Sequence, residues 1–200
     1  MKIHNFEQGT EEWFEVRKLK LTASDATAIG NKGAGLETLV KKKIRELIIK
    51  SDDNFTNKHI ERGNELEPIA RAAYEFEYNV EVVEVGFIEH NEYSGCSPDG
   101  LVGDDGGIEI KARNDEKHFD FILGAEIDYG TIWQIQMNLL ITKRKWWDFI
   151  SYNPNFKKSM VVIRVYPDEV KQKKLTEGIE YGAKRLKELL ENNNVKSELK

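Results

Sequence analysis

Three residues of this sequence, Asp99, Glu109 and Lys111, have the types and the spacing to perform hydrolytic chemistry. An apolar pair follows Asp99 closely, residues 103–107 are rich in Gly and Asp, and Ile-Glu-Ile-Lys at 108–111 then alternates like a half-buried strand. We therefore expect a hairpin of two short strands. Because residues two apart in a strand share a face, Glu109 and Lys111 would point the same way, with Asp99 folded back beside them.

Two carboxylates and one ammonium on a single patch suit a site for a hard divalent cation. Mg²⁺ binds through one or two carboxylates and completes its shell with waters and substrate phosphate. The metal would neutralise charge on a phosphoryl group, and Lys111 could orient or help deprotonate the attacking water. A plainer interpretation is a surface hairpin in which Asp99 starts a turn and the other two side chains face solvent. Pro-Asp-Gly alone is an ordinary turn, but Pro-Asp, nine residues and then Glu-x-Lys is far more specific and favours the metal site.

Hydrophobic periodicity and turn residues predict the elements that must position this hairpin. We expect helices from about Thr10 past Trp13 and over 36–48, 58–76, 118–124, 131–142 and 168–191, strands over 80–88, 146–152 and 160–166, loops over 30–35 and 51–57, and a frayed polar tail over 192–200. This order predicts an α/β fold with a central mixed β-sheet flanked by helices. No linker is long enough to divide the chain, so a single domain over 1–200 is expected.

Composition narrows the class of protein. With 200 residues, 40% of them hydrophobic and 32% charged, the chain has the make-up of a soluble globular protein. No run approaches the ~20 apolar residues of a membrane span and the first residues lack an apolar signal core, so we expect a cytoplasmic location and no membrane contact. The lone Cys96 excludes an internal disulfide and is expected to be a small buried residue. The net charge of −5 opposes nucleic-acid binding unless basic residues gather on one face.

Arg17 and Ser24 are candidates for a phosphate site near the N-terminus. Thr22 to Asp25 is typical of a capping box, in which Thr22 caps a helix and Asp25 lies three residues further on. A helix N-terminus offers free N–H groups and hydroxyls to an anion, and a nearby arginine would complement them. Local features alone favour the plainer interpretation, which is capping plus a solvated arginine.

Polar side chains also occur where apolar ones are expected. Glu67 lies on an otherwise apolar helix face, where a carboxylate is rare unless it is paired or metal-bound, and the simple alternative is a surface pair with Arg71. Pro68 predicts a kink in the same helix. Gln134 and Gln136 lie in a helix that is apolar on several sides, so each needs a partner. One could face the hairpin and its bound nucleotide, or both could bond to nearby backbone.

Several separate blocks resemble, in the same order, the family of phage lambda exonuclease and the YqaJ-type viral recombinases, within the PD-(D/E)xK nuclease superfamily. The blocks are Gln8-Gly9-Thr10 with Trp13, Arg17 before Thr22-Ala23-Ser24, Gly63 with Glu67 and Ala70-Arg71, Cys96 to Leu101, Glu109-Ile110-Lys111, and Gln134-Ile135-Gln136. The likeness runs to about Tyr166 and implies a restriction-endonuclease-like fold that forms one nuclease domain. Two segments, 30–58 and 112–130, do not match cleanly, so the resemblance assigns no DNA-path residues there.

The resemblance also implies a role for each matching residue. It implies catalytic roles for Glu67, Asp99, Glu109, Lys111 and Gln134; metal ligands at Asp99, Glu109, the backbone carbonyl of Ile110 and, nearby or through water, Glu67; and a 5′-phosphate pocket formed by Arg17, Ser24 and Ser97. Lys111 would position the attacking water. The phosphate role reverses the local preference for plain capping at Arg17 and Ser24.

Family activity implies an exonuclease that uses one or two Mg²⁺ ions, with Mn²⁺ as a substitute, and degrades the 5′ strand of linear double-stranded DNA to 5′ mononucleotides. The remaining 3′ single strand would serve a single-strand annealing protein in phage recombination, in the host cytoplasm if a phage encodes the chain. A homo-oligomer, a trimeric ring threaded by DNA, is implied as well and would reconcile the acidic net charge with a basic channel. The alternatives are an endonuclease or RecB-like nuclease of the same fold, and a non-catalytic module that binds DNA ends or docks a recombinase.

Overall fold

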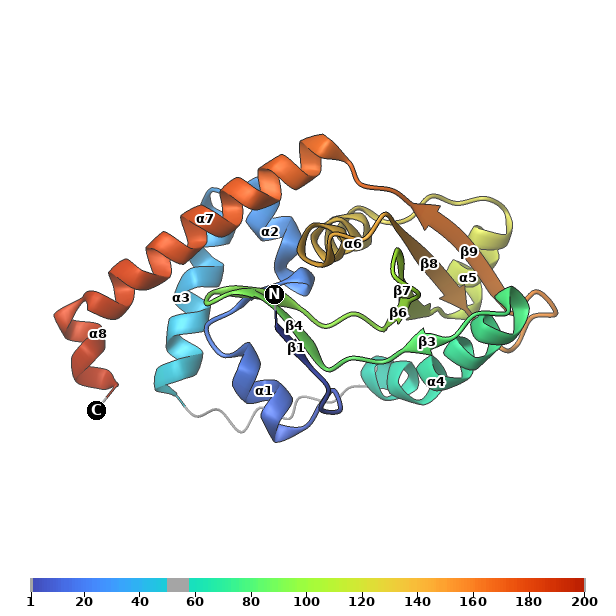
Figure 1. Cartoon of the computed structure of the whole chain (residues 1–200), viewed down its shortest axis with the longest axis horizontal. Coiled ribbons are helices and arrows are strands. Elements are labelled where there is room, and N and C mark those ends of the chain that lie inside the picture. Colours follow the sequence, from blue (N-terminus) through green and yellow to red (C-terminus); the bar gives the residue numbers. More distant parts are fainter. Residues whose placement is uncertain (1, 50–57, 200) are drawn as a thin grey trace.

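The computed structural model describes residues 2–49 and 58–199, which form two β-sheets with helices packed around them (Figure 1). The strands are β1 (Lys2–His4), β2 (Leu21–Thr22), β3 (Val82–Val83), β4 (Phe87–Asn91), β5 (Ser94–Cys96), β6 (Gly100–Val102), β7 (Gly106–Ala112), β8 (Trp146–Tyr152) and β9 (Met160–Val165). The helices are α1 (Glu11–Arg17), the 3₁₀ turn η1 (Ala23–Asp25), α2 (Ala26–Asn31), α3 (Ala34–Ile48), α4 (Lys58–Tyr78), α5 (Asp115–Ile122), α6 (Tyr129–Thr142), α7 (Glu169–Glu191) and α8 (Asn193–Glu198). None of these described helices is long and apolar enough to cross a membrane. The expected loop over 51–57 lies outside the described residues.

The larger sheet carries the hairpin and has the strand order β3-β6-β7-β8-β9. β6 and β7 are antiparallel partners with Gly100 opposite Ile108, so the hairpin expected from the sequence is confirmed. β7 pairs in parallel with β8, and Glu109 lies opposite Phe149. Parallel neighbours require a crossover connection, which α5 and α6 supply. The sheet is therefore mixed, as predicted.

Side-chain alternation along β7 and β8 divides the interior into two cores. Ile108 and Ile150 pack with Tyr74 of α4 in the smaller core. Phe149 joins the larger core with side chains of α6. The two helices thus cover opposite faces of the sheet, and Glu109, the register partner of Phe149, faces α6.

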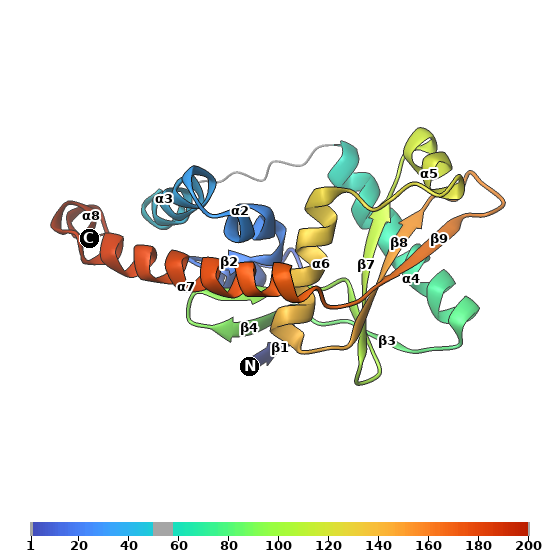
Figure 2. The same cartoon turned by 90° about the horizontal axis from the view of Figure 1, so that it is seen from above.

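The smaller sheet has the order β1-β4-β5-β2 and holds the N-terminal part of the chain. The long helix α7 runs beside α2 and α3 and also packs against α6 (Figure 2). Cys96 is completely buried at the end of β5, as expected. The chain then passes through only Ser97, Pro98 and Asp99 before it enters β6 of the larger sheet. These three residues link the two sheets. Side chains held by the smaller sheet and side chains held by the larger sheet therefore come close together at this link.

The sequence predictions were wrong in several places near the smaller sheet. Gly30 was expected in a flexible loop, but it lies in α2 against Trp133, where an added Cβ would be 2.2 Å from the ring. The break between α2 and α3 is confined to Lys32 and Gly33, both with positive φ. Strands β1 and β2, three and two residues long, gave no periodic signal and were not predicted.

Three other boundaries differ from expectation. The strand expected over 80–88 is divided into β3 and β4, which belong to different sheets. The crossing occurs at Gly86, where an added Cβ would lie 2.2 Å from the carbonyl oxygen of Phe6, and only glycine allows this approach. The polar tail expected to fray contains α8, because the Asn192 side chain caps that helix. Helix α5 also starts earlier than expected, at Asp115.

Candidate active site

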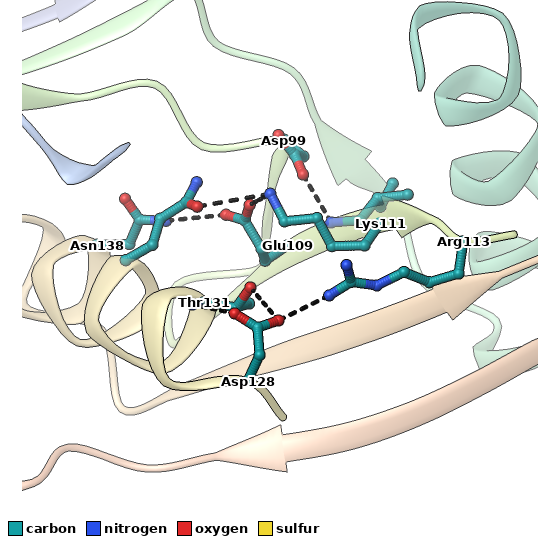
Figure 3. A network of polar contacts seen from close by, with 9 residues as sticks. Asp99, Glu109, Lys111, Arg113, Asp128, Thr131 and Asn138 are labelled. Atoms are coloured by element: carbon teal, nitrogen blue, oxygen red, sulfur yellow. Dashed lines mark hydrogen bonds and ion pairs between the residues drawn. The ribbon is translucent and has the colours of Figure 1, made fainter. Parts of the chain in front are cut away.

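Asp99, Glu109 and Lys111 meet where the hairpin lies beside α6 (Figure 3). The backbone N–H of Ile110 donates to Asp99 Oδ2 at 2.6 Å, which pins the aspartate against β7. Glu109 and Lys111 lie on the same face, and Lys111 Nζ is 2.6 Å from Glu109 Oε1. The patch of two carboxylates and one ammonium predicted from the spacing is therefore present.

Helix α6 supplies the amides that border this patch. Asn138 is fully buried and donates through Nδ2 to Glu109 Oε2 at 3.3 Å. Gln134 lies one helical turn earlier, and its Oε1 is 3.5 Å from Lys111 Nζ. Gln136 points elsewhere, since it bonds to the carbonyl of Tyr166 at 2.8 Å. Of the two glutamines singled out from the sequence, Gln134 thus faces the hairpin and Gln136 braces the backbone.

The charges in the patch are incompletely balanced. Burial raises the pKa of Asp99 well above its usual range, and the nearby carboxylates Glu109 and Glu67 raise it further. Burial opposes the charge on Lys111, but the Glu109 and Asp99 carboxylates outweigh that effect and raise its pKa above the ordinary lysine value. The lysine is therefore an ammonium, while the acidic groups crowd one another. An added cation would relieve this crowding.

The donor set fits a hard cation. Asp99 uses one oxygen for the Ile110 N–H, and within the described residues its Oδ1 accepts no hydrogen bond. Across 2–49 and 58–199, no three His, Cys, Asp or Glu side chains form a metal cluster of their own. Such a sparse set suits Mg²⁺, which takes one or two carboxylates and keeps water and substrate oxygens for the rest. The Ile110 carbonyl as a further ligand stays a prediction.

Glu67 approaches the patch from α4, on the other side of the hairpin from α6. Its pKa is raised by burial and by the Glu109 charge, against the opposing effect of Arg71. Arg71 Nη2 donates to Glu67 Oε1 at 2.7 Å, so the i,i+4 pair considered from the sequence exists. It is not a surface pair, because the Arg71 side chain is only 9% exposed. Helix α4 continues through Pro68, which is exposed.

An ion pair between Arg113 and Asp128 joins the end of β7 to the start of α6. Arg113 Nη2 donates to Asp128 Oδ2 at 2.8 Å. Asp128 also caps α6 by accepting hydrogen bonds from the N–H and the hydroxyl of Thr131. The ion pair therefore fixes the position of the first turn of α6 along β7, the strand that carries Lys111. Gln134 lies only one turn beyond this cap, so its position relative to Lys111 is fixed as well.

The predicted phosphate residues lie at the link between the sheets. Arg17 Nη1 donates to Ser97 Oγ at 2.9 Å, and Trp13 Nε1 donates to the same oxygen at 2.9 Å. The guanidinium lies over the Trp13 ring at 4.0 Å. Gln8 Nε2 donates to the carbonyl of Pro98 at 2.9 Å and holds the link in place. Arg17 is therefore held against Ser97, which lies two residues before Asp99 in the chain.

Ser24 is the least engaged of the three predicted phosphate residues. It is exposed at η1, and its hydroxyl pairs with that of Thr22 at 3.0 Å. The capping box expected there is confirmed, with Thr22 and Asp25 bonded reciprocally. The Asp25 charge acts on Arg17, whose pKa is lowered by burial and partly restored by Asp25, so η1 and α1 face the same space. No contact joins Ser24 directly to Arg17 within the described residues.

Sequence reasoning missed Asn138 and the role of Trp13 as a support for Arg17. The helical spacing of 134 and 138 carried a signal, since four residues is one turn and both amides then share a face. Trp13 was noted only as a position in the first expected helix and in one of the blocks that resemble the family. Its indole N–H could have been expected to seek a partner once buried.

Comparison with known proteins decides the family. The YqaJ-like viral recombinase domain family matches residues 12–145 of the chain. This chain belongs to that family. A curated relative, the uncharacterized protein R354 of Acanthamoeba polyphaga mimivirus, is 33% identical over 105 residues, which are half of this chain but only 18% of that protein.

Solved structures agree with the family assignment. The alkaline exonuclease LHK-Exo of Laribacter hongkongensis is 33% identical, with a TM-score of 0.84 over 94% of this chain and 98% of that one. Its complex with dAMP matches with 32% identity and a TM-score of 0.82, over 94% of this chain and 95% of that one. A phage-related exonuclease of Haemophilus somnus 129PT shares the fold at 15% identity, with a TM-score of 0.66 over 88% and 97% of the two chains. The fold is thus the predicted PD-(D/E)xK type, and it is shared with solved exonucleases.

Proposed function

We propose that this protein is a divalent-metal-dependent exonuclease that degrades the 5′ strand of linear double-stranded DNA to 5′ mononucleotides. The observation that carries the proposal is the convergence of Asp99, Glu109, Lys111 and Gln134 at one end of the link that also holds Ser97 against Arg17. An acidic patch two residues along the chain from the serine that holds Arg17 suits a scissile phosphate and a terminal phosphate held a short distance apart.

In this proposal the hairpin and α6 act on the attacking water and the scissile phosphate. Asp99 and Glu109 would hold the metal, with the Ile110 carbonyl and Glu67 beside it, and the metal would supply charge neutralisation and an activated water. Lys111, held as an ammonium between Glu109 and Gln134, would orient that water. Asn138 keeps the Glu109 carboxylate in one rotamer.

The pocket would make cleavage depend on a DNA end. Arg17 and the hydroxyls of Ser97 and Ser24 would bind a 5′-phosphate, and a fixed distance from this pocket to the metal would select the first phosphodiester. A charge-assisted bond from a partly buried arginine is stronger than one in open solvent. The dAMP complex of the Laribacter exonuclease supports mononucleotide products by analogy.

The wider biological role follows the same analogy. A 3′ single strand exposed by such an enzyme is the substrate of single-strand annealing proteins, which we propose as its functional partner in phage recombination. A trimeric ring around the DNA, a cytoplasmic location and Mg²⁺ as the resident ion, with Mn²⁺ as a substitute, remain parts of the proposal.

The decisive experiment uses linear duplex DNA labelled at either end, with Mg²⁺ or with EDTA. We expect Mg²⁺-dependent release of 5′-labelled mononucleotides, lost in Lys111→Ala and retained in Lys145→Ala. Lys145 is a suitable control because it pairs with Asp105 at the exposed turn of the same hairpin. A covalently closed circle should stay intact.

The other outcomes each point to a different protein. Cutting of the closed circle would replace the proposal by an endonuclease. Digestion from 3′ ends, or only within a larger assembly, would favour a RecB-like nuclease. Tight binding to ends without any Mg²⁺-dependent loss of label would leave a non-catalytic end-binding or recombinase-docking module.

A further inference from the structure

Arg71 makes three polar contacts to three separate segments around the acidic patch. Nη2 donates to Glu67 Oε1 at 2.7 Å, within α4. Nε donates to the backbone carbonyl of Asp99 at 3.2 Å, at the link between the sheets. Nη1 lies 2.8 Å from Glu84 Oε2, in the segment between β3 and β4. One buried guanidinium thus ties α4 to both ends of the path that leads into the hairpin.

Helix stability alone does not account for this arrangement. An i,i+4 pair on a helix surface contributes only about 0.2–0.5 kcal/mol and needs no burial. Here the guanidinium is 9% exposed, whereas Glu84 is 69% exposed and could pair with solvent instead. Burying an arginine is unfavourable unless several acceptors are arranged for it, and a planar fork with five donors can serve three acceptors at once.

We propose that Arg71 is a positioning residue for the metal site, and this inference rests on the proposed nuclease function. Arg71 donates hydrogen bonds to both the Asp99 carbonyl and the Glu67 carboxylate. It thereby sets the distance between the Asp99 side chain and the Glu67 side chain, which would approach the cation from the hairpin and from α4. In this role Arg71 acts through Asp99 and Glu67 rather than on the metal or the substrate. Outer partners of this kind typically change metal affinity by 10–100-fold when removed.

The planar guanidinium makes arginine the residue required at position 71. A lysine at position 71 would keep the positive charge but, as a point charge on a flexible stem, could not hold both the Glu67 oxygen and the Asp99 carbonyl in fixed directions. Glu84 has a smaller part, because its side chain is mostly solvated and pairs with the guanidinium from outside. Glu84→Gln should therefore have little effect on the site.

The test measures Mn²⁺ binding to the DNA-free protein by the electron paramagnetic resonance signal of the free ion. We expect Arg71→Met to weaken Mn²⁺ binding about tenfold and Arg71→Lys several-fold, with Glu84→Gln near the unmodified protein. Arg144→Met is the matched control, since Arg144 donates to the carbonyls of Val102, Gly103 and Gly106 at the far turn of the hairpin. It should lower thermal stability and leave Mn²⁺ binding unchanged.

A second readout separates positioning from simple loss of stability. In Arg71→Lys, higher Mn²⁺ should restore degradation of linear duplex toward the unmodified rate, with the KM for DNA unchanged. Unchanged Mn²⁺ affinity in folded Arg71→Met or Arg71→Lys would overturn the inference. If Arg71→Met fails to fold, the lysine variant decides alone. Mn²⁺ binding by an unmodified protein that leaves DNA intact would instead refute the proposed function and spare this inference.

Discussion

Two fully buried carboxylates lie on neighbouring strands of the larger sheet, and their surroundings differ. Asp148 on β8 receives two hydrogen bonds from Arg164, at 2.8 Å each, and one from the Tyr74 hydroxyl at 2.7 Å. Glu109 on β7 has Lys111 and the single Asn138 amide, with other acidic groups close by. Asp148 is saturated by donors, whereas Glu109 is left short of positive charge.

The two arginines of these regions show the same contrast. Arg164 is bonded at both ends of its fork to Asp148 and also covers the Trp146 ring at 3.7 Å. Arg17 donates to a neutral hydroxyl, burial lowers its pKa, and no carboxylate of residues 2–49 or 58–199 is bonded to it. A charged side chain that stabilises the fold has its counter-charge within the fold. We expect a charged side chain that binds a ligand to lack one until the ligand arrives.

The largest effect is expected from neutralising the under-compensated carboxylate. Glu109→Gln keeps the shape of the side chain but removes a proposed metal ligand, so release of 5′-labelled nucleotide should fall by about 10³-fold or more, several kcal/mol in the barrier. Single-turnover digestion of end-labelled duplex measures it. Asp148→Asn, equally buried, should retain most of the rate when folded, and equal losses in the two variants would erase the distinction.

Stability should respond in the opposite order. Asp148→Asn leaves Arg164 without its bidentate acceptor and should cost about 2–3 kcal/mol, below the ~3–5 kcal/mol of a fully buried pair because Arg164 is 42% exposed. Urea unfolding in EDTA measures the loss. Glu109→Gln should cost far less, and could stabilise the metal-free protein by relieving the repulsion around Asp99.

Removing Arg17 should change end recognition. Arg17→Ala is expected to keep metal binding but to lose the preference for 5′-phosphorylated over 5′-hydroxyl ends, a change of about 10–100-fold, which corresponds to one charged hydrogen bond of ~1.5–3 kcal/mol. Competition between the two substrates measures the preference. Equal rates on both ends in the unmodified protein would contradict the phosphate pocket.

The smallest expected effect concerns pH. Because the folded-state pKa of Asp99 is raised, the folded protein holds a proton that the unfolded chain has released. Its contribution to the free energy of unfolding should therefore fall as the pH rises from about 4, the ordinary aspartate value, through the raised pKa, and stay constant above it. Urea unfolding in EDTA over this range should show a slope that Asp99→Asn lacks. Saturating Mg²⁺, by favouring the charged carboxylate, should weaken it.

The hairpin with its three polar residues could be predicted from the sequence because it is local. Alternation at 108–111 fixed the faces, and the turn at 103–107 fixed the pairing of β6 with β7. The division of 80–88 between two sheets could not be predicted, because it depends on the approach of Gly86 to Phe6, far away in sequence. The prediction of a loop at Gly30 was wrong for a similar reason, because the Trp133 ring that requires a glycine there comes from another helix.

The residues of the proposed site also differ in whether local sequence or long-range contacts determine them. Asp99, Glu109 and Lys111 follow from spacing. Local features singled out Glu67, Gln134, Arg17 and Ser24, whose roles the resemblance to a family then implied, and Ser97 came from the resemblance alone. The contacts that give these residues their geometry are long-range. Arg71 was visible only as an i,i+4 partner of Glu67, and its grip on the Asp99 carbonyl appears once α4 is placed beside the hairpin.

The parallel pairing of β7 with β8 has a consequence for synthesis of the protein on the ribosome. Asp99 and Glu109 emerge well before the crossover through α5 and α6 that delivers Gln134, Asn138 and finally β8. A pairing between such distant segments forms late, because a long loop must close first. Nascent chains therefore carry the acidic residues without the amides and the strand that fix them, and the proposed cleavage of DNA would have to wait until the sheet is complete.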